Sequence, residues 1–118
     1  MASELTIRIR LSFSKGGAEV KRSEDMSITV TGDTFTHGVQ SIGTTEEELV
    51  QGADLGTPGY AFIINLDGTN YVEIGSTTGV YDIKVKAGEF ALYRHNSATI
   101  YAKSDTASVN VEYVIIED

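Results

Sequence analysis

The sequence is unusually rich in β-branched residues. Val, Ile and Thr together make up 34 of the 118 residues, whereas Leu and Ala make up 15. β-Branched side chains lose rotamer freedom on a helix but pack well on a pleated sheet. Twelve glycines supply turns, and Pro58 is the only proline. This composition predicts an all-β chain.

Strict alternation of apolar and polar residues supports this prediction. Apolar side chains occupy every second position from Leu5 to Phe13 and again from Val109 to Ile115. Because successive strand side chains point to opposite faces, these segments are predicted to be half-buried strands. The apolar run Tyr60–Leu66 favours a central strand buried on both faces.

Turn signals divide the rest of the chain into short segments. Gly16-Gly17 predicts a turn, Ala18–Arg22 a short return strand, and Arg22–Asp25 a charged turn. Asp67-Gly68 predicts a tight hairpin. Thr44–Glu48 suggests one short helical turn or a loop, with a strand starting at Leu49-Val50 as the alternative.

Eight to ten short strands without β-α-β alternation predict an antiparallel β-sandwich, jelly-roll-like in type. The length suits one domain, so we expect a single β-sandwich domain over residues 1–118. The strand Leu5–Phe13 is expected to belong to this sandwich; the alternative is an edge that pairs with a neighbouring subunit.

Charge and composition exclude several classes of function. The net charge is −8, spread evenly as −4 over residues 1–59 and −4 over residues 60–118. An acidic chain is a poor binder of nucleic-acid backbones, so we expect no nucleic-acid partner. The sequence has no cysteine and no apolar run that approaches a membrane helix, so we expect neither disulfides nor a membrane partner.

The residues that could carry catalysis are sparse. His95 is expected in an exposed loop, and His37 on the core-facing side of a short strand. Asn65–Asn70 places oxygen ligands as in a calcium loop, but the closing glutamate is missing and position twelve is Ser76. We therefore expect no catalytic residue, no metal ion and no cofactor. The six tyrosines are expected to serve mainly in packing.

Two segments of the chain, the exposed face of the first strand and the segment around Phe35, provide candidate interface residues. These are Arg8 and Arg10 on the first strand, and Phe35 and His37 further along. Lys84 and Lys86 would extend a basic patch if their strand lay beside the first; ordinary cross-strand charge pairing is the favoured interpretation.

The second half also resembles a known group of proteins. The segments that carry the resemblance are Gly56–Phe62, Asn65–Asp67, Asn70–Gly75, Lys86–Glu89, Tyr101–Lys103 and Val111–Asp118. Their order and spacing are similar to those of small β-sandwich virion proteins of tailed bacteriophages, over roughly residues 40–118. These motifs are turn glycines and strand patterns and carry no catalytic residues.

The resemblance implies a non-enzymatic virion structural protein, first of all a capsid decoration (cement) protein. Such a protein binds the major capsid lattice as a homo-oligomer, with a trimer favoured, and is localised in the virion after assembly in the host cytoplasm. The alternatives are a tail or head–tail junction protein, and a carbohydrate- or receptor-binding β-sandwich module.

Overall fold

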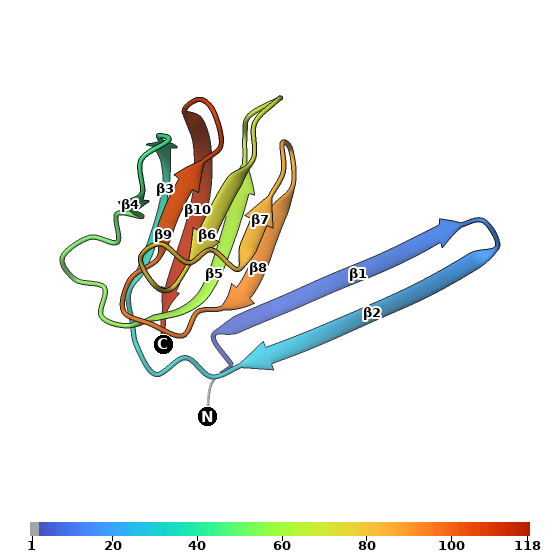
Figure 1. Cartoon of the computed structure of the whole chain (residues 1–118). Coiled ribbons are helices and arrows are strands. Elements are labelled where there is room, and N and C mark those ends of the chain that lie inside the picture. Colours follow the sequence, from blue (N-terminus) through green and yellow to red (C-terminus); the bar gives the residue numbers. More distant parts are fainter. Residues whose placement is uncertain (1–2) are drawn as a thin grey trace. The chain divides into compact units, whose positions relative to one another are not determined.

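The structure, a computed structural model, describes residues 3–118 and divides the chain into two compact units. The first unit ends at Thr31 and is a long two-stranded hairpin. The second, Gly32–Asp118, contains the remaining eight strands (Figure 1).

The second unit is a sandwich of two four-stranded sheets. One sheet has the order β3-β10-β5-β8 and the other the order β4-β9-β6-β7. The strands are β3 (Phe35–Ile42), β4 (Glu47–Glu48), β5 (Pro58–Asn65), β6 (Val72–Gly75), β7 (Ile83–Val85), β8 (Phe90–Arg94), β9 (Tyr101–Ser104) and β10 (Val109–Glu117).

The order of strand pairing identifies the topology. β3 pairs with β10, β4 with β9, β5 with β8 and β6 with β7, all antiparallel. The first sandwich strand thus pairs with the last, the second with the next to last, and so on inward. A chain folded back on itself in this way and rolled into two sheets is a jelly roll. The predicted all-β antiparallel fold is confirmed.

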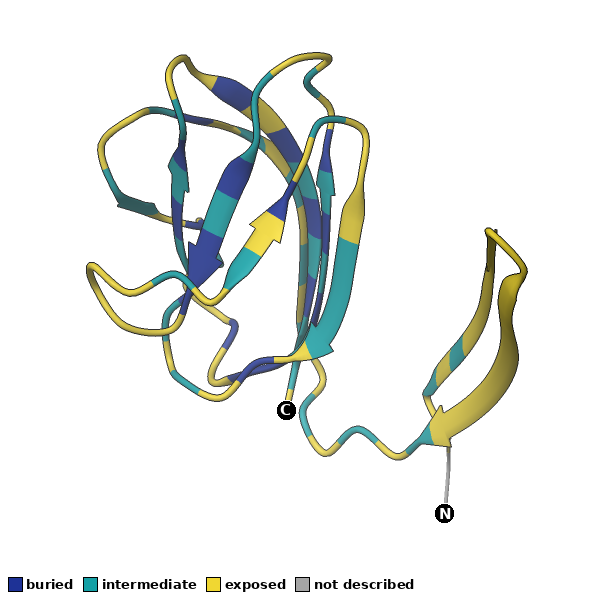
Figure 2. Cartoon of the chain, turned by 45° about the vertical axis from the view of Figure 1, so that its right-hand side comes forward, coloured by how far each residue is buried: buried dark blue, intermediate teal, exposed yellow. Residues whose placement is uncertain are grey.

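Alternation along each strand builds the core between the two sheets. On β10, Val109, Val111, Tyr113 and Ile115 are buried, while the residues between them are partly or fully exposed. Figure 2 shows the same banding on neighbouring strands. In the described part of the chain, the buried apolar cluster lies between Ile42 and Ile115, so the sandwich supplies its own core.

The hairpin consists of β1 (Leu5–Lys15) and β2 (Ala18–Ile28). Its register runs unbroken from Leu5 opposite Ile28 to Lys15 opposite Ala18. Gly16 and Gly17 form the turn with φ values of +58° and +87°. Two successive positive φ values match the right-handed twist of the flanking strands, so the strands can continue over their full length.

This hairpin corrects two predictions. Ala18–Ile28 is one strand, so the predicted charged turn at Arg22–Asp25 is wrong; its side chains pair along the strand instead, as in the Arg22–Glu24 ion pair. Strand β1 pairs with β2 alone within residues 3–118, so it is not a strand of the sandwich. The sandwich expected over residues 1–118 is built by Gly32–Asp118.

Two predictions of local structure in the sandwich also differ from the structure. Asp67-Gly68 does not close a tight hairpin, because β5 and β6 belong to different sheets and the chain must cross between them. The Asp67 carboxylate instead accepts hydrogen bonds from the amides of Thr69 and Asn70, at 2.9 and 2.7 Å. Around Thr44–Glu48 no helical turn forms, since Glu47 and Glu48 pair with β9.

Candidate interaction surfaces

One face of the hairpin is almost wholly apolar. Cross-strand partners point to the same side of a sheet, so the register gathers eight apolar side chains on one face: Leu5, Ile7, Ile9, Leu11, Phe13, Val20, Met26 and Ile28. Five of the eight are strongly exposed, from 41% for Met26 to 56% for Leu11. The Arg22–Glu24 pair interrupts this apolar face near its middle, and Lys15 lies at its turn end.

The opposite face of the hairpin is polar. Arg8 Nε donates a hydrogen bond to Asp25 across the strands at 3.1 Å, and Lys21 lies 3.5 Å from Glu19. Arg10 lies on the same exposed face. Cross-strand and along-strand charge pairing, the favoured interpretation, is thus the arrangement here. The alternative basic patch would need Arg8 and Arg10 beside Lys84 and Lys86, which belong to a different unit.

A two-stranded hairpin is marginally stable by itself in water; independent stability needs a third strand or a packed apolar face. Burying one large apolar side chain contributes about 1.5–3 kcal/mol. Leaving five such side chains strongly exposed therefore forgoes much of the stabilisation that this sequence pattern offers. An exposed apolar face of this kind is typical of a surface that binds another molecule.

The sandwich carries a second apolar surface, on the outer side of the sheet β3-β10-β5-β8. The alternation that buries Ile63 and Tyr113 points their neighbours outward. These outward residues are mostly apolar: Phe35, Val39, Tyr60, Phe62, Ile64, Phe90, Leu92, Val114 and Ile116. Phe62 and Phe90 pack edge to face with ring centroids 5.5 Å apart. We call this side of the sheet, which also carries the polar residues His37, Ser41, Arg94, Asn110 and Glu112, the outer sheet face.

Phe35 and His37, two of the interface candidates, lie on the outer sheet face. Phe35 is 66% exposed. The His37 side chain is 52% exposed and its Nε2 lies 2.9 Å from a Glu112 carboxylate oxygen. The prediction that His37 points to the core is wrong: β3 directs its odd-numbered side chains outward up to Ser41, and the interior positions fall on the even-numbered residues.

Sequence reasoning missed the central part of the outer sheet face. The apolar run of β5 predicts a strand that is buried on both faces. Its inner residues are buried, but Phe62 and Ile64 are only half-buried. A strand that is apolar on both faces indicates two covered sides, and in this chain only one side is covered by the second sheet.

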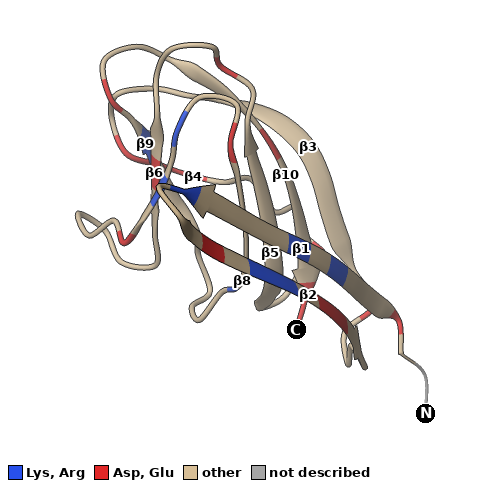
Figure 3. Cartoon of the chain, turned by 90° about the vertical axis from the view of Figure 1, so that its right-hand side faces the viewer, with Lys and Arg blue, Asp and Glu red and all other residues tan. Residues whose placement is uncertain are grey.

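The two units differ in net charge. Residues 1–31 carry five basic and four acidic side chains, a net charge of +1; residues 32–118 carry four and 13, a net charge of −9. The even distribution over the two sequence halves therefore does not describe the folded molecule. Figure 3 shows basic and acidic residues mixed on the hairpin and acidic residues predominating on the sandwich.

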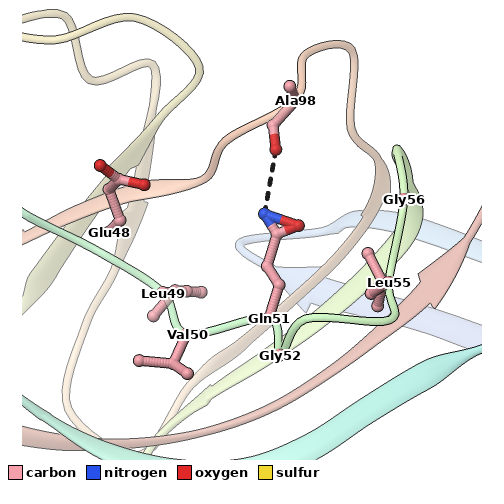
Figure 4. A pocket seen from close by; sticks show the side chains of 8 residues that line it. All are labelled: Glu48, Leu49, Val50, Gln51, Gly52, Leu55, Gly56 and Ala98. Atoms are coloured by element: carbon pink, nitrogen blue, oxygen red, sulfur yellow. Dashed lines mark hydrogen bonds between the residues drawn. The ribbon is translucent and has the colours of Figure 1, made fainter.

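The concavities of the sandwich are shallow. One lies beside the connector after β4 and is lined by Glu48–Gly52, Leu55, Gly56 and Ala98. Its chain segments are joined by Gln51, whose amide donates to the Ala98 carbonyl at 3.0 Å (Figure 4). Glu48 is the only charged side chain in its lining.

A second concavity is lined by residues of the β6–β7 and β8–β9 ends, including Asp82, Tyr93, Arg94, His95 and Asn96. His95 is only 6% exposed, so the predicted exposed loop is wrong at this position. Its Nε2 lies 2.9 Å from the Ser97 hydroxyl and 2.8 Å from the Thr99 carbonyl, which fixes the turn that leads to β9.

Tyr93 lies beside His95 with ring centroids 5.7 Å apart. Burial raises the pKa of its hydroxyl well above the ordinary range, and no hydrogen-bond partner for this hydroxyl is found among residues 3–118. The second concavity is thus small and of mixed polarity, and the ring of its histidine bonds to the local turn.

Within residues 3–118, no three His, Asp or Glu side chains converge as a metal site would require. The same residues contain no helix of the length and apolarity that a membrane crossing needs. No protein-family model and no curated protein sequence matches the chain.

Proposed function

We propose that this chain is a non-enzymatic structural protein of a tailed-bacteriophage virion, specifically a capsid decoration protein that binds the major capsid lattice. It acts as a homo-oligomer, with a trimer favoured, and needs neither a cofactor nor a metal ion. It assembles onto the particle in the host cytoplasm without contacting nucleic acid or membrane.

The observation that carries this proposal is the exposed apolar face of the hairpin. A contiguous apolar surface of this length is typical of a protein–protein contact. A decoration protein needs a rigid domain and an extended contact region rather than a reactive cleft. The self-sufficient core of the sandwich and the separate hairpin meet these two requirements.

The fold adds support by analogy only. Eight-stranded jelly rolls occur in viral capsid proteins and also in lectins, and a fold by itself does not determine function. The virion role is favoured by the two apolar surfaces and by the resemblance of residues 40–118 to phage β-sandwich proteins.

Copy number in purified particles tests this proposal. Quantitative mass spectrometry of particles from a phage encoding the chain should find tens to hundreds of copies per particle. A handful of copies would instead assign the protein to the tail or the head–tail junction. Complete absence from purified particles would exclude a virion role.

A carbohydrate-binding module is the second candidate, because Asp82, Arg94 and Asn96 line one concavity. Sugar sites use exposed aromatic platforms with polar groups around them. The six tyrosines are all half-buried or buried, which counts against this function. Glycan-array binding that is lost in Asp82→Ala but kept in Asp54→Ala would favour it over the virion role.

A further inference from the structure

One chain thus carries two exposed surfaces that are both largely apolar: one face of the hairpin and the outer sheet face. We propose that the hairpin of one copy lays its apolar face across the outer sheet face of a second copy, so that each copy gives one hairpin and receives another. This names the contact of the homo-oligomer in the proposed function, and rests on that function only for its biological purpose.

Matching polar groups support this pairing. The charged groups on the two surfaces are mostly paired: Arg22 with Glu24 on the hairpin, and His37 with Glu112 and Arg94 with Asp118 on the sheet. Lys15 adds a positive charge at the turn end of the hairpin face. Charged groups in a buried contact must find partners. Because both surfaces carry acidic and basic side chains, these groups can exchange partners on association.

The net charges of the two units support the choice of a second copy as the partner. The hairpin is slightly basic and the sandwich strongly acidic, at +1 and −9. A hairpin therefore meets an attractive field near another copy's sandwich, whereas two sandwiches repel each other. This disfavours direct contact between two outer sheet faces and favours the contact between hairpin and sheet.

The size of the contact shows why exchange is needed. Two 11-residue strands present a face roughly 36 Å long and about 10 Å wide, on the order of 400 Å². A stable interface buries about 800 Å² on each partner. In a reciprocal dimer the two hairpin contacts join the same two copies and together reach this area; in a cyclic trimer each copy reaches it summed over its two neighbours.

Charge-introducing variants of the full chain test the hairpin side. Leu11→Asp and Ser12→Asp add the same charge at adjacent positions on opposite hairpin faces. Sedimentation equilibrium should show association weakened about 30-fold or more by Leu11→Asp, the size of a hot-spot loss, and unchanged by Ser12→Asp. Equal effects of the two would overturn the proposal.

A second matched pair tests the sheet side. Val39 lies on the outer sheet face and is 61% exposed, whereas Val50, in the connector after β4, is 62% exposed. Val39→Asp should weaken association as strongly as Leu11→Asp, and Val50→Asp should not. Thermal unfolding of each variant verifies that the sandwich remains folded. Normal association of a folded Val39→Asp variant would overturn the proposal.

Crosslinking identifies which surfaces meet. Because the chain has no cysteine, Leu11→Cys and Val39→Cys provide unique thiols. Mixed copies treated with a short bismaleimide should give a Leu11–Val39 link between chains. Exclusive Leu11–Leu11 links, a link only within the doubly substituted monomer, or a wild-type chain that stays monomeric would each overturn the proposal.

These measurements use the purified chain, so they are independent of particle incorporation. A chain that self-associates through these surfaces but is absent from particles refutes the proposed function and not this contact. A chain that is abundant in particles but monomeric when pure refutes this contact and leaves the proposed function intact.

Discussion

Gly75, at the end of β6, sits where a side chain has no room. A Cβ atom there would lie 1.9 Å from the Val80 carbonyl oxygen, a backbone atom. Gly75→Ala should therefore lower the free energy of unfolding by about 3 kcal/mol, measured by denaturant titration. Gly38→Ala is the control, since its Cβ would meet only the Tyr113 hydroxyl at 3.9 Å. A Gly75→Ala variant as stable as Gly38→Ala would contradict the close approach.

Glu46 joins the loop before β4 to the β6–β7 loop, accepting hydrogen bonds from the Thr78 hydroxyl, the Gly79 amide and the Tyr81 hydroxyl. The bond from Thr78, followed by those from Tyr81 and Gly79, lowers the pKa of Glu46 below 4.5. The bond to Glu46, with burial, raises the pKa of Tyr81 from 10.0 to about 12.

A carboxyl with a lowered pKa stabilises the fold above pH 4.5 and loses that effect as pH falls through the folded pKa. A phenol with a raised pKa stabilises it below pH 10 and loses that effect as pH rises towards 12.

Tyr81→Phe should therefore lower the melting temperature most between about pH 5 and pH 9, with the difference from the wild type shrinking in acid and above pH 10. Circular dichroism melts across this range measure it. Tyr60→Phe, which keeps its aromatic ring, should show no such pH profile. A Tyr81→Phe difference that is constant from acid to alkaline pH would mean that this hydrogen bond does not operate.

The glycines of the turn allow a test of the whole hairpin. Gly17, at φ +87°, occupies a conformation that a β-branched residue does not adopt without strain. Gly17→Val should disrupt the hairpin and abolish self-association, while the melting temperature of the sandwich stays unchanged. Gly16→Asn should be tolerated, because Asn-Gly suits this turn type. Loss of the sandwich transition in Gly17→Val would show that the hairpin contributes to the core.

Strands with strict alternation were predictable from the sequence because their signal is local. Leu5–Ser14 and Val109–Ile116 were both found close to their expected positions. The assignment of strands to sheets was not predictable in the same way, because the jelly roll pairs residues 35–42 with residues 109–116. Such distant pairing depends on packing of the whole core and not on any local pattern.

The candidate surfaces were predictable only in part. Alternation identified the apolar side of β1, but not that it lies outside the sandwich, because a strand's pattern does not reveal what covers it. His95 was placed wrongly since its neighbours Arg94 and Asn96 are polar and exposed. Its burial comes from a turn in which Ser97 and Thr99 fold back on the ring, and sequence polarity does not report such a turn.

At the scale of the whole molecule, the proposed contact between copies would cover the hairpin. The hairpin holds five of the nine Lys and Arg residues, so trypsin has most of its cleavage sites there: Arg8, Arg10, Lys15, Lys21 and Arg22. All five are exposed in the single chain. Cleavage requires an extended, locally opened backbone, and a poorly stabilised hairpin opens far more readily than a packed sandwich.

Dilute protein should therefore lose the hairpin to trypsin first and leave a stable fragment that contains the sandwich. Concentrated protein should be cut more slowly in the hairpin, because hairpins covered by neighbouring copies remain paired. Mass spectrometry of timed digests measures both rates, with cleavage at Lys84 and Lys86 as the internal reference that association leaves unchanged. Leu11→Asp should abolish the dependence on concentration, whereas Ser12→Asp should retain it. Hairpin cleavage that is equally fast at every concentration would mean that no copy covers another, and the apolar face would then require a different partner.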